Sequence, residues 1–291
     1  MMDIRVLEYF LAVAREQNIT RASQVLHVTQ PTLSRQLAAL EKELGVRLFD
    51  RTNHSTVLTE EGVVFRRRAE DIVSMARRAA EELRQGDTEL AGTIAVGSGE
   101  LLSVRELGRL IAAFQERNPQ VRFELYSGDN EDIDDRLRQG MLDVGLCLEP
   151  FNTQGYEYIR MRTMEQWGVL VHDAHPLAAQ DAIRPGDLVG TRVMTVHVGT
   201  PTHMQLAKWS GRHAKKMNFY ANYNVLYNAV MVARERQGVV VCLKQDATYD
   251  HMRFLPLDPK LELGSVLIWR RGQSFSKATE AFMGFVQGVY Q

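Results

Sequence analysis

Residues 29–35 bring together side chains that can read the bases of a nucleic acid. Their sequence, TQPTLSR, places hydroxyl, amide and guanidinium groups within about two helical turns. Arginine can pair bidentately with guanine, glutamine pairs in the same way with adenine, and serine or threonine bonds to bases or phosphates. The residues of this stretch that we expect to contact DNA are Thr29, Gln30, Pro31, Thr32, Ser34 and Arg35.

The leucines that follow predict the helix that presents these side chains. They recur at three- and four-residue spacing, so a helix over residues 29–44 buries one face and turns the polar face outward. Gly45 suits a left-handed C-terminal cap. The alternative is that Thr29, Pro31 and Ser34 merely begin a helix, as such residues commonly do. The leucines of the inward face are Leu33, Leu37, Leu40 and Leu44.

Two earlier helices complete a small domain. Asp3 can cap a helix that carries an apolar stripe and ends near residues 17–18. Thr20 is expected to cap a second, shorter helix that turns Ala22, Val25 and Leu26 inward. The tight turn HVT then leads into the third helix. Two short helices joined in this way predict a helix-turn-helix, whose second helix lies in the DNA major groove.

The next segment, VRLFDRTNHSTVLT, predicts a hairpin around a polar turn at residues 52–55. Its apolar residues, Val46 and Val57 among them, are expected to close the three-helix core. The hairpin can act as a wing beside the DNA. The wing residues expected near the sugar-phosphate backbone are Arg51, Asn53 and His54.

A long helix is predicted over residues 62–85, which contain no proline and no internal glycine. Apolar residues repeat there with alternating four- and three-residue spacing, the heptad pattern by which two helices pack along each other. We expect this seam to join two copies of the chain, although packing within one chain is the alternative. The seam residues are Phe65, Ala69, Ile72, Ala76, Ala79 and Leu83.

The pattern changes after a polar, glycine-bounded linker at residues 86–93. Short apolar runs of strand length, such as TIAVGS, DVGLCL and SVLIWR, alternate there with helical segments. This alternation predicts parallel sheet of the doubly wound kind, and about 200 residues suit two lobes. We expect a DNA-binding domain at 1–61, a dimerisation helix and hinge at 62–91, and an α/β domain at 92–291. Its first lobe would take 92–162 with 267–291, and its second 163–266.

The composition sets further bounds on function. The apolar fraction is 45% and the charged fraction 24%, as in ordinary folded proteins, and the net charge is -1. A DNA-binding surface must therefore arise from the arrangement of charges. No run approaches a membrane span, and acidic residues interrupt the N-terminus where a signal peptide would be apolar, so a cytoplasmic protein is expected. Cys147 and Cys242 lie in apolar runs that predict buried thiols, with a redox pair as the less favoured alternative.

The chain resembles the LysR-type transcriptional regulators. The residues that carry the resemblance are LSRQ, LFDR and LTEEG, with the alanine-bearing second helix before them, and more loosely GTIAVGS, GMLDVGL and HPLA further along. The resemblance implies a winged helix-turn-helix, a dimerising linker helix and a two-lobed effector domain like that of periplasmic binding proteins. It further implies binding to promoter DNA, a small-molecule effector, a homodimer or homotetramer, and RNA polymerase as a partner of an activator. No cofactor or metal is expected.

The effector site is expected beyond the C-terminal ends of the strands, where open α/β sheets bind their ligands. Many relatives carry a hydroxyl-rich loop where this chain has GSGELLS, so Glu100 could itself occupy a site for an anion. The alternative is that Glu100 only caps a helix. The candidate effector residues are Ser98, Gly99, Glu100, Ser127, Thr200, Pro201 and Thr202.

Two other classes of protein compete with a regulator. An enzyme is disfavoured because VGSGE lacks the third glycine of a dinucleotide loop and no nucleophile elbow appears. His172 and His175 have no third ligand nearby, so a structural role is expected for them. A solute-binding protein would leave the N-terminal helices unexplained. We therefore predict a DNA-binding regulator and no enzyme.

Overall fold

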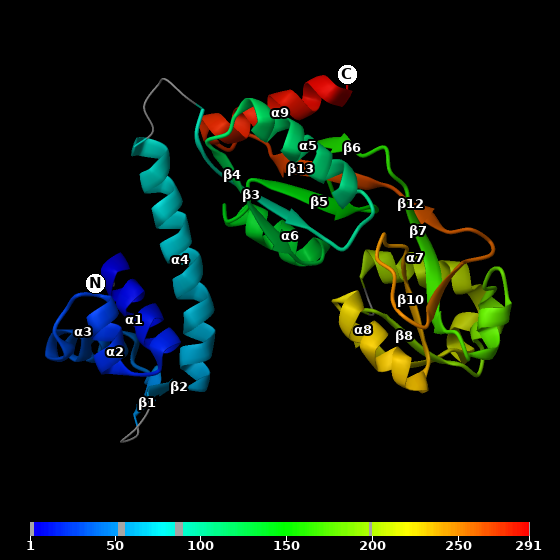
Figure 1. Ribbon diagram of the computed structural model, residues 1–291, viewed down its shortest axis with the longest axis horizontal. Helices are drawn as coiled ribbons and strands as arrows, with labels where there is room; N and C mark the ends of the chain where they lie inside the picture. Colours follow the sequence, from blue (N-terminus) through cyan, green and yellow to red (C-terminus); the bar gives the residue numbers. More distant parts are fainter. Residues whose placement is uncertain (1–2, 52–55, 85–89, 198–199, 291) are drawn as a thin grey trace. The chain divides into compact units, whose positions relative to one another are not determined.

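The computed structural model of the chain contains two compact units, Met1–Gly86 and Asp87–Gln291 (Figure 1). It describes residues 3–51, 56–84, 90–197 and 200–290, and for residues 51, 78, 81–84, 236 and 237 it describes the backbone only. Within these ranges, no helix is both long and apolar enough to cross a membrane.

The first unit contains the three short helices, the hairpin and the long helix that the sequence predicts. The hairpin strands pair antiparallel, with Phe49 opposite Leu58. The elements are α1 (Ile4–Glu16), α2 (Ile19–Val25), α3 (Gln30–Leu44), β1 (Phe49–Arg51), β2 (Thr56–Leu58) and α4 (Glu60–Arg84).

Polar residues fix where the short helices begin and end. The Asp3 carboxylate accepts a hydrogen bond from the Arg5 amide at the start of α1, as expected. The cap of α2 is Asn18, whose side-chain oxygen accepts from the Arg21 amide at 3.0 Å. The prediction that Thr20 caps this helix is wrong. The helix begins at Ile19, directly after Asn18, whose backbone is extended and whose side chain accepts a hydrogen bond from a free N–H group at the helix start. Gly45 ends α3 with φ 71°, the left-handed cap that the sequence predicts.

Phe10 of α1 lies at the centre of the core of the first unit. It is fully buried, and its ring lies 5.2 Å from that of Phe49 and 5.0 Å from that of Phe65, so it joins α1 to the wing and to α4. Leu33, Leu37 and Leu40 of α3 are buried in the same cluster. A single aromatic side chain therefore ties the wing and the long helix to the helix-turn-helix.

Four of the apolar residues expected in this core are exposed. Leu44 is 36% exposed, Val25 51%, Val46 41% and Val57 38%. Side chains alternate across a strand, so Val57 must face outward when its neighbours Thr56 and Leu58 face inward. On α2 Ala22 is buried as expected, and the second buried residue is Ser23.

The long helix α4 packs against α1 through a stripe with uniform four-residue spacing. Ala69 and Val73 are buried in the core of the first unit and Phe65 packs against it. Arg77, one turn further on, forms an ion pair with Glu8 of α1 at 2.7 Å. The first two residues of the predicted heptad seam thus serve this unit's own core, which is the alternative that the sequence left open.

The second unit begins with a five-stranded sheet in the order β4-β3-β5-β13-β6. Helices α5 and α9 cover one face and α6 covers the other (Figure 1), with side chains from each helix in the matching core cluster. The strands are β3 (Gly92–Ser98), β4 (Val121–Ser127), β5 (Val144–Leu148), β6 (Tyr156–Arg160) and β13 (Ser265–Arg270), and the helices are α5 (Val104–Arg117), α6 (Asn130–Arg138) and α9 (Lys277–Tyr290).

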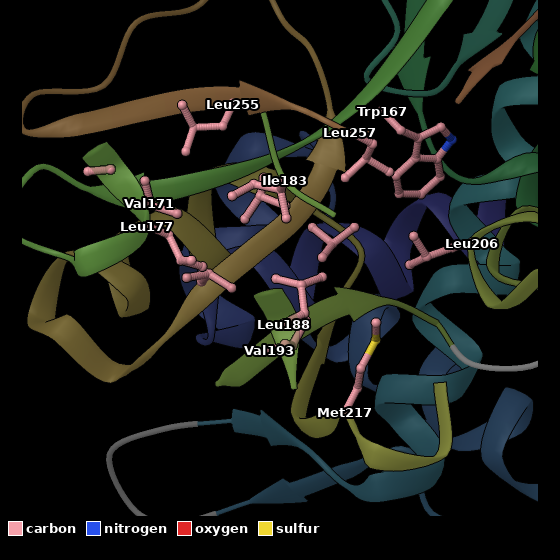
Figure 2. Close-up of a cluster of buried hydrophobic side chains, with 14 residues drawn as sticks. Trp167, Val171, Leu177, Ile183, Leu188, Val193, Leu206, Met217, Leu255 and Leu257 are labelled. Atoms are coloured by element: carbon pink, nitrogen blue, oxygen red, sulfur yellow. The ribbon is translucent and has the colours of Figure 1, made fainter. Parts of the chain in front are cut away.

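The chain forms a second sheet before it returns to the first one. Its strands lie in the order β11-β7-β10-β8-β9, with β12 beside β7. Its larger core cluster, shown in Figure 2, contains Trp167, Leu206 and Leu257. Helix α8 packs on the opposite face. The strands are β7 (Glu165–His172), β8 (Arg192–Val196), β9 (Asn218–Tyr223), β10 (Val239–Leu243), β11 (Met252–Pro256) and β12 (Glu262–Leu263), and the α-helices are α7 (Pro201–Ser210) and α8 (Leu226–Val232).

Both sheets are mixed, so the parallel pairing that the sequence predicts is present in each sheet together with antiparallel pairs. Strand β3 runs parallel to β4 and β5, but β13 is antiparallel to its two neighbours, and β7 is antiparallel to β10 and β11. The reason is topological: after the second sheet is complete, the chain returns and adds β13 to the first sheet from the opposite end. The chain therefore passes between the sheets twice, at 161–164 and at residue 264.

Two glycines inside helices give opposite expectations for stability. A Cβ at Gly62 would lie 2.1 Å from the carbonyl oxygen of Leu48, whereas one at Gly108 would meet nothing within 4 Å. We expect Gly62→Ala to destabilise the first unit by about 1–3 kcal/mol, because the wing must shift. Gly108→Ala should stabilise the second unit by up to about 1 kcal/mol, since alanine is the better helix former. Urea denaturation of the full chain measures both, and equal signs would contradict the expectation.

Candidate functional site

The first residues of α3 form an exposed polar surface. Gln30, Pro31 and Arg35 are exposed, and Thr32 and Ser34 are half-buried, while the first three leucines of the same helix are buried. The Thr29 and Thr32 hydroxyl groups lie 2.8 Å apart, so they hold each other at the helix start. The Arg35 Nε donates only a long bond, 3.3 Å, to the Pro31 carbonyl. Its guanidinium group is therefore available to a partner on this surface.

The wing is fastened to α3 by backbone groups. One oxygen of the Glu41 carboxylate accepts hydrogen bonds from the Leu48 amide at 2.8 Å and the Phe49 amide at 3.1 Å. The Thr59 hydroxyl donates to the Arg47 carbonyl at 2.7 Å and accepts from the Gly62 amide. The structure thus places β1 at a fixed distance from α3. The strand spacing in the sequence predicted the wing, but nothing in it marked Glu41 as the residue that braces it.

The wing residues proposed for DNA contact are described only in part. Arg51 is the last residue of β1, and its backbone lies opposite that of Thr56. Asn53 and His54 lie outside the described residues.

Beyond its contact with α1, helix α4 exposes an apolar stripe. Ile72 and Met75 are each 39% exposed, Ala79 is exposed and Ala76 is half-buried. The Leu83 side chain lies outside the described part of the chain. The stripe that remains open to a second copy therefore begins at Ile72, about two turns later than the sequence predicted.

The second unit contains a cavity of about 800 Å³, the size of a typical small-molecule site, between the ends of its two sheets. Five of the seven predicted effector residues line it: Gly99, Glu100, Thr200, Pro201 and Thr202. The remaining two do not. The Ser98 hydroxyl turns back to the Gly99 carbonyl at 2.8 Å, and at the end of β4 the residue that reaches the cavity is Gly128, directly after Ser127.

Other lining residues were not predicted. They come from the α6 start, the loop after β5, and strands β7, β9 and β10. The acidic and amide residues among them are Asp129, Asn130, Glu131, Asp134, Asn152, Asn224 and Gln245, and the aromatic ones are Phe151, Trp167 and Tyr223. The sequence GDNED after β4 carries the composition of a helix cap, and this signal could have identified Asp129.

Carboxylates of the chain cap three helices around the cavity. Glu165 is fully buried and accepts hydrogen bonds from the Leu102 amide at 2.7 Å and the Ser103 amide at 2.9 Å, just before α5. Glu100 accepts from the Leu226 amide, the first residue of α8, at 2.7 Å. Asp129 accepts from two amides of α6. Glu100 is thus a cap, as the alternative prediction had it, but it caps a helix of the other lobe.

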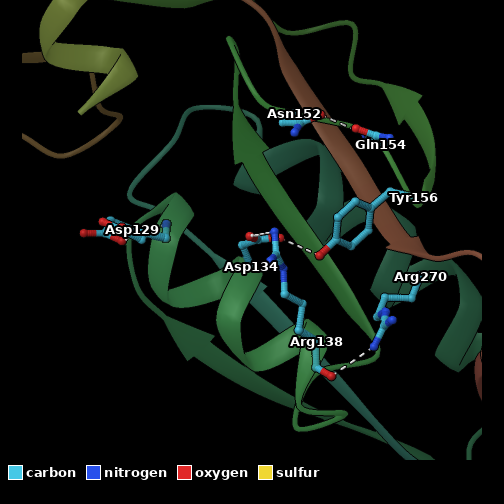
Figure 3. A network of polar contacts seen from close by, with 8 residues as sticks. Asp129, Asp134, Arg138, Asn152, Gln154, Tyr156 and Arg270 are labelled. Atoms are coloured by element: carbon cyan, nitrogen blue, oxygen red, sulfur yellow. Dashed lines mark hydrogen bonds and ion pairs between the residues drawn. The ribbon is translucent and has the colours of Figure 1, made fainter. Parts of the chain in front are cut away.

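The Asp134 carboxylate is neutralised by two partners, as Figure 3 shows. The Tyr156 hydroxyl donates to one of its oxygens at 2.5 Å, and Arg138 forms an ion pair with the other at 2.6 Å. Burial, and then the bond to Asp134, raise the pKa of the Tyr156 hydroxyl. Tyr156 therefore remains a hydrogen-bond donor at neutral pH, and its bond to Asp134 fixes α6 to β6.

A second carboxylate anchors the passage between the sheets. Glu106 accepts hydrogen bonds from the Arg162 and Thr163 amides, from the Thr163 hydroxyl and from the Tyr290 hydroxyl. Burial acts to raise the pKa of Glu106, but the bonds from Tyr290, Thr163 and Arg162 together lower it. Glu106 thus holds the connecting segment to α5 in its charged form.

The remaining candidates for chemistry have structural roles. Cys147 and Cys242 are free and buried in different core clusters, and burial raises the pKa of both thiols. The His175 ring accepts from the Leu177 amide and caps a 3-10 helix, which confirms its predicted structural role. Across the described ranges, no group of three or more potential ligands could hold a metal ion.

The two units together define a class of protein in which a helix-turn-helix is joined to a two-lobed domain with a ligand-sized cavity. Comparison with protein-family models identifies both parts. Residues 4–63 match the bacterial regulatory helix-turn-helix protein model of the lysR family, and residues 87–291 match the LysR substrate binding domain. The chain belongs to the LysR family and is a DNA-binding transcriptional regulator with an effector-binding domain.

Individual relatives agree with this assignment. The chain is 32% identical over 203 residues to the transcriptional regulator YybE of Bacillus subtilis, covering 70% of this chain and 69% of YybE. It is 40% identical over 146 residues to BsdA of the same organism, covering half of each protein. With the Hca operon transcriptional activator HcaR of Escherichia coli it shares 33% identity, over 67% of this chain and 65% of HcaR.

Solved structures share the fold over the whole chain. The crystal structure of CbnR, a LysR family transcriptional regulator, matches with a TM-score of 0.72 at 21% identity and full coverage of both chains. Full-length CbnR in complex with its target DNA matches with a TM-score of 0.69 at 22% identity, over 99% of each chain. At these identities the likeness establishes the architecture.

The Glu106 network predicts how the stability of the second unit depends on pH. Because the pKa of Glu106 is lowered in the folded chain, its contribution is complete above the unfolded value near 4.5 and is lost as pH falls through the folded value. We expect Tyr290→Phe to cost about 1 kcal/mol at neutral pH and less in acid. Urea unfolding at several pH values measures this. Tyr158→Phe, at an exposed position of β6, is the control, and a cost for Tyr290→Phe that does not change with pH would contradict the role of charge.

Proposed function

We propose that α3 reads promoter DNA through its first two turns and that a small molecule in the cavity of the second unit controls this binding. The observation that supports the DNA-reading role most strongly is the division of α3 into a buried leucine face and an exposed face with Gln30, Pro31 and Arg35 at its start. A surface of small polar residues with one long cation can approach base edges closely. The protein would act on chromosomal DNA in the cytoplasm, and as an activator it would also contact RNA polymerase.

The two DNA-contacting regions have different roles in this proposal. Thr29, Thr32 and Ser34 lie at a helix N-terminus, which favours a nearby phosphate, while Arg35 reaches the bases. Arg51, Asn53 and His54 of the wing would contact the sugar-phosphate backbone. Base contacts would therefore set the sequence preference, and wing contacts would add affinity for any DNA.

Effector control requires that the ligand favour one arrangement of the two lobes. The hydrogen bond from the Leu226 amide to Glu100 joins residues of the two lobes beside the cavity. A ligand that contacts either residue alters the free energy of this bond. Lobe closure would then change how the assembled subunits space their reading heads on DNA.

Substitution of the two arginines separates base reading from backbone contact. We expect Arg35→Ala to weaken binding to the chain's own upstream DNA by about 1–3 kcal/mol, with a smaller effect on unrelated DNA. Arg51→Ala should weaken both alike and reduce the salt dependence of binding. Fluorescence anisotropy with both DNAs over a range of salt concentrations measures this. Equal losses for Arg35→Ala on the two DNAs would make Arg35 a phosphate contact, and no retention of upstream DNA at low salt would contradict the proposal as a whole.

The exposed stripe of α4 is proposed as the contact with a second copy. Ile72→Asp places a charge in this stripe and should lower the self-association constant at least about tenfold, because a buried charge without a partner is unfavourable. Ser74→Asp, about 200° around the helix, is the matched control. Sedimentation velocity at a series of concentrations measures the effect. An unchanged association constant for Ile72→Asp would place the interface elsewhere.

A further inference from the structure

The charges that line the cavity have one sign. Four of the lining residues are acidic, Glu100, Asp129, Glu131 and Asp134, and none of the described lining residues is Lys or Arg. Arg138 balances Asp134. For the other three carboxylates, the described side chains provide no basic ion-pair partner. The electrostatic potential of the cavity is therefore expected to be negative.

The helix starts that could attract an anion are already occupied by the chain itself. Glu165, Asp129 and Glu100 accept the free amides near the starts of α5, α6 and α8. A helix N-terminus binds an anion through such amides, and a carboxylate that caps it takes that role. At α7, the cap is the Thr200 hydroxyl and the first helical residue is Pro201, which has no N–H. A ligand with a carboxylate group would thus meet carboxylates of the chain at the positions where it needs hydrogen-bond donors.

A buried hydrogen-bond donor of one lining residue has no partner among the described residues. Trp167 lines the cavity and is fully buried, and its indole Nε1 has no hydrogen-bond partner. Figure 2 shows this nitrogen on the edge of the ring that is remote from Leu257. A buried N–H without a partner is unfavourable, and a ligand that brings an acceptor removes this penalty. Phe151 and Tyr223 add aromatic surface to the same wall.

We propose that the cavity takes an organic cation, a primary amine or guanidine on an apolar body that also carries a hydrogen-bond acceptor. The inference rests on the proposed effector role of the cavity and names the chemical class of the effector. The cationic group would lie beside Glu100 and Glu131, and the acceptor would face Trp167. Because Glu100 also accepts from the Leu226 amide across the lobes, a cation that binds its carboxylate competes for that bond. Ligand charge and lobe closure are coupled in this way.

Three probes with one skeleton test the charge class on the full chain. Tyramine is the cation, 3-(4-hydroxyphenyl)propionate the anion and 2-(4-hydroxyphenyl)ethanol the neutral control. All three carry the same phenol oxygen as an acceptor. We expect tyramine to raise the melting temperature of the second unit and to bind at least about tenfold more tightly than the acid in calorimetry. The guanidine of the same skeleton, 4-(2-guanidinoethyl)phenol, keeps the phenol oxygen and should stabilise the chain in the same direction. Tighter binding of the acid, or no stabilisation by either cation at millimolar concentration, would overturn the proposal.

Two variants assign the effect to the named carboxylates. Glu131→Gln and Glu100→Gln should each weaken tyramine roughly tenfold and leave the neutral alcohol unchanged, since the amide keeps the shape and, at position 100, an acceptor for the Leu226 amide. Asp135→Asn, an exposed position of α6 outside the cavity, is the matched control. Tyramine binding that survives both Gln substitutions would also overturn the proposal.

Binding to upstream DNA is measured in parallel without any probe. Loss of DNA binding alone would contradict the proposed regulatory function and leave the charge preference of the cavity standing. If the cavity prefers the acid while DNA binding is intact, only the proposed cationic class of the ligand is contradicted. The two failures are therefore distinguishable.

Discussion

The architecture of the second unit depends on one buried interaction, the Glu165 carboxylate with the Leu102 and Ser103 amides. A fully buried carboxylate is tolerated only when hydrogen bonds replace its hydration, and two short charge-assisted bonds do so here. Because Glu165 begins β7 while the two amides precede α5, the interaction fixes the first passage between the sheets. The wall of the cavity is built on this fixed point.

Glu100 and Glu106 extend the same principle around the cavity. Glu106 holds the Arg162 and Thr163 amides, and Glu100 reaches the first residue of α8. In each case a carboxylate of one lobe accepts hydrogen bonds from backbone amides of the connecting segment or of the other lobe. Unpaired amides at helix starts would otherwise need water or a ligand. The chain thus supplies its own anions, and this sets the charge that a ligand meets.

Membership of the LysR family and the chemistry of the cavity answer different questions. The family defines a regulator with a DNA-binding unit and an effector-binding unit, and a shared fold leaves the ligand open. The ligand class follows from the side chains of this chain, above all from the carboxylates and from the unpaired Nε1 of Trp167. In the first unit, individual side chains of this chain likewise set the local geometry: Glu41 and Phe10 hold the wing in place.

The sequence alone determined the parts that depend on local patterns. Leucine spacing in α3, the cap at Gly45 and the apolar runs of the strands are read from neighbouring residues, so the helix-turn-helix and the alternating α/β unit were predictable. Edge strands such as β6 and β9 were missed because their polar faces weaken the apolar signal.

Tertiary structure decided what depends on residues far apart in the chain. Glu165 caps amides 62 and 63 residues away, and Glu100 caps one 126 residues away, so no local pattern marks them. The stripe by which α4 packs on α1 was likewise settled by the partner helix, which selected Val73 over Ile72. The physical reason is the same throughout: periodicity specifies which face of an element is apolar, whereas the satisfaction of a buried polar group depends on what the fold brings to it.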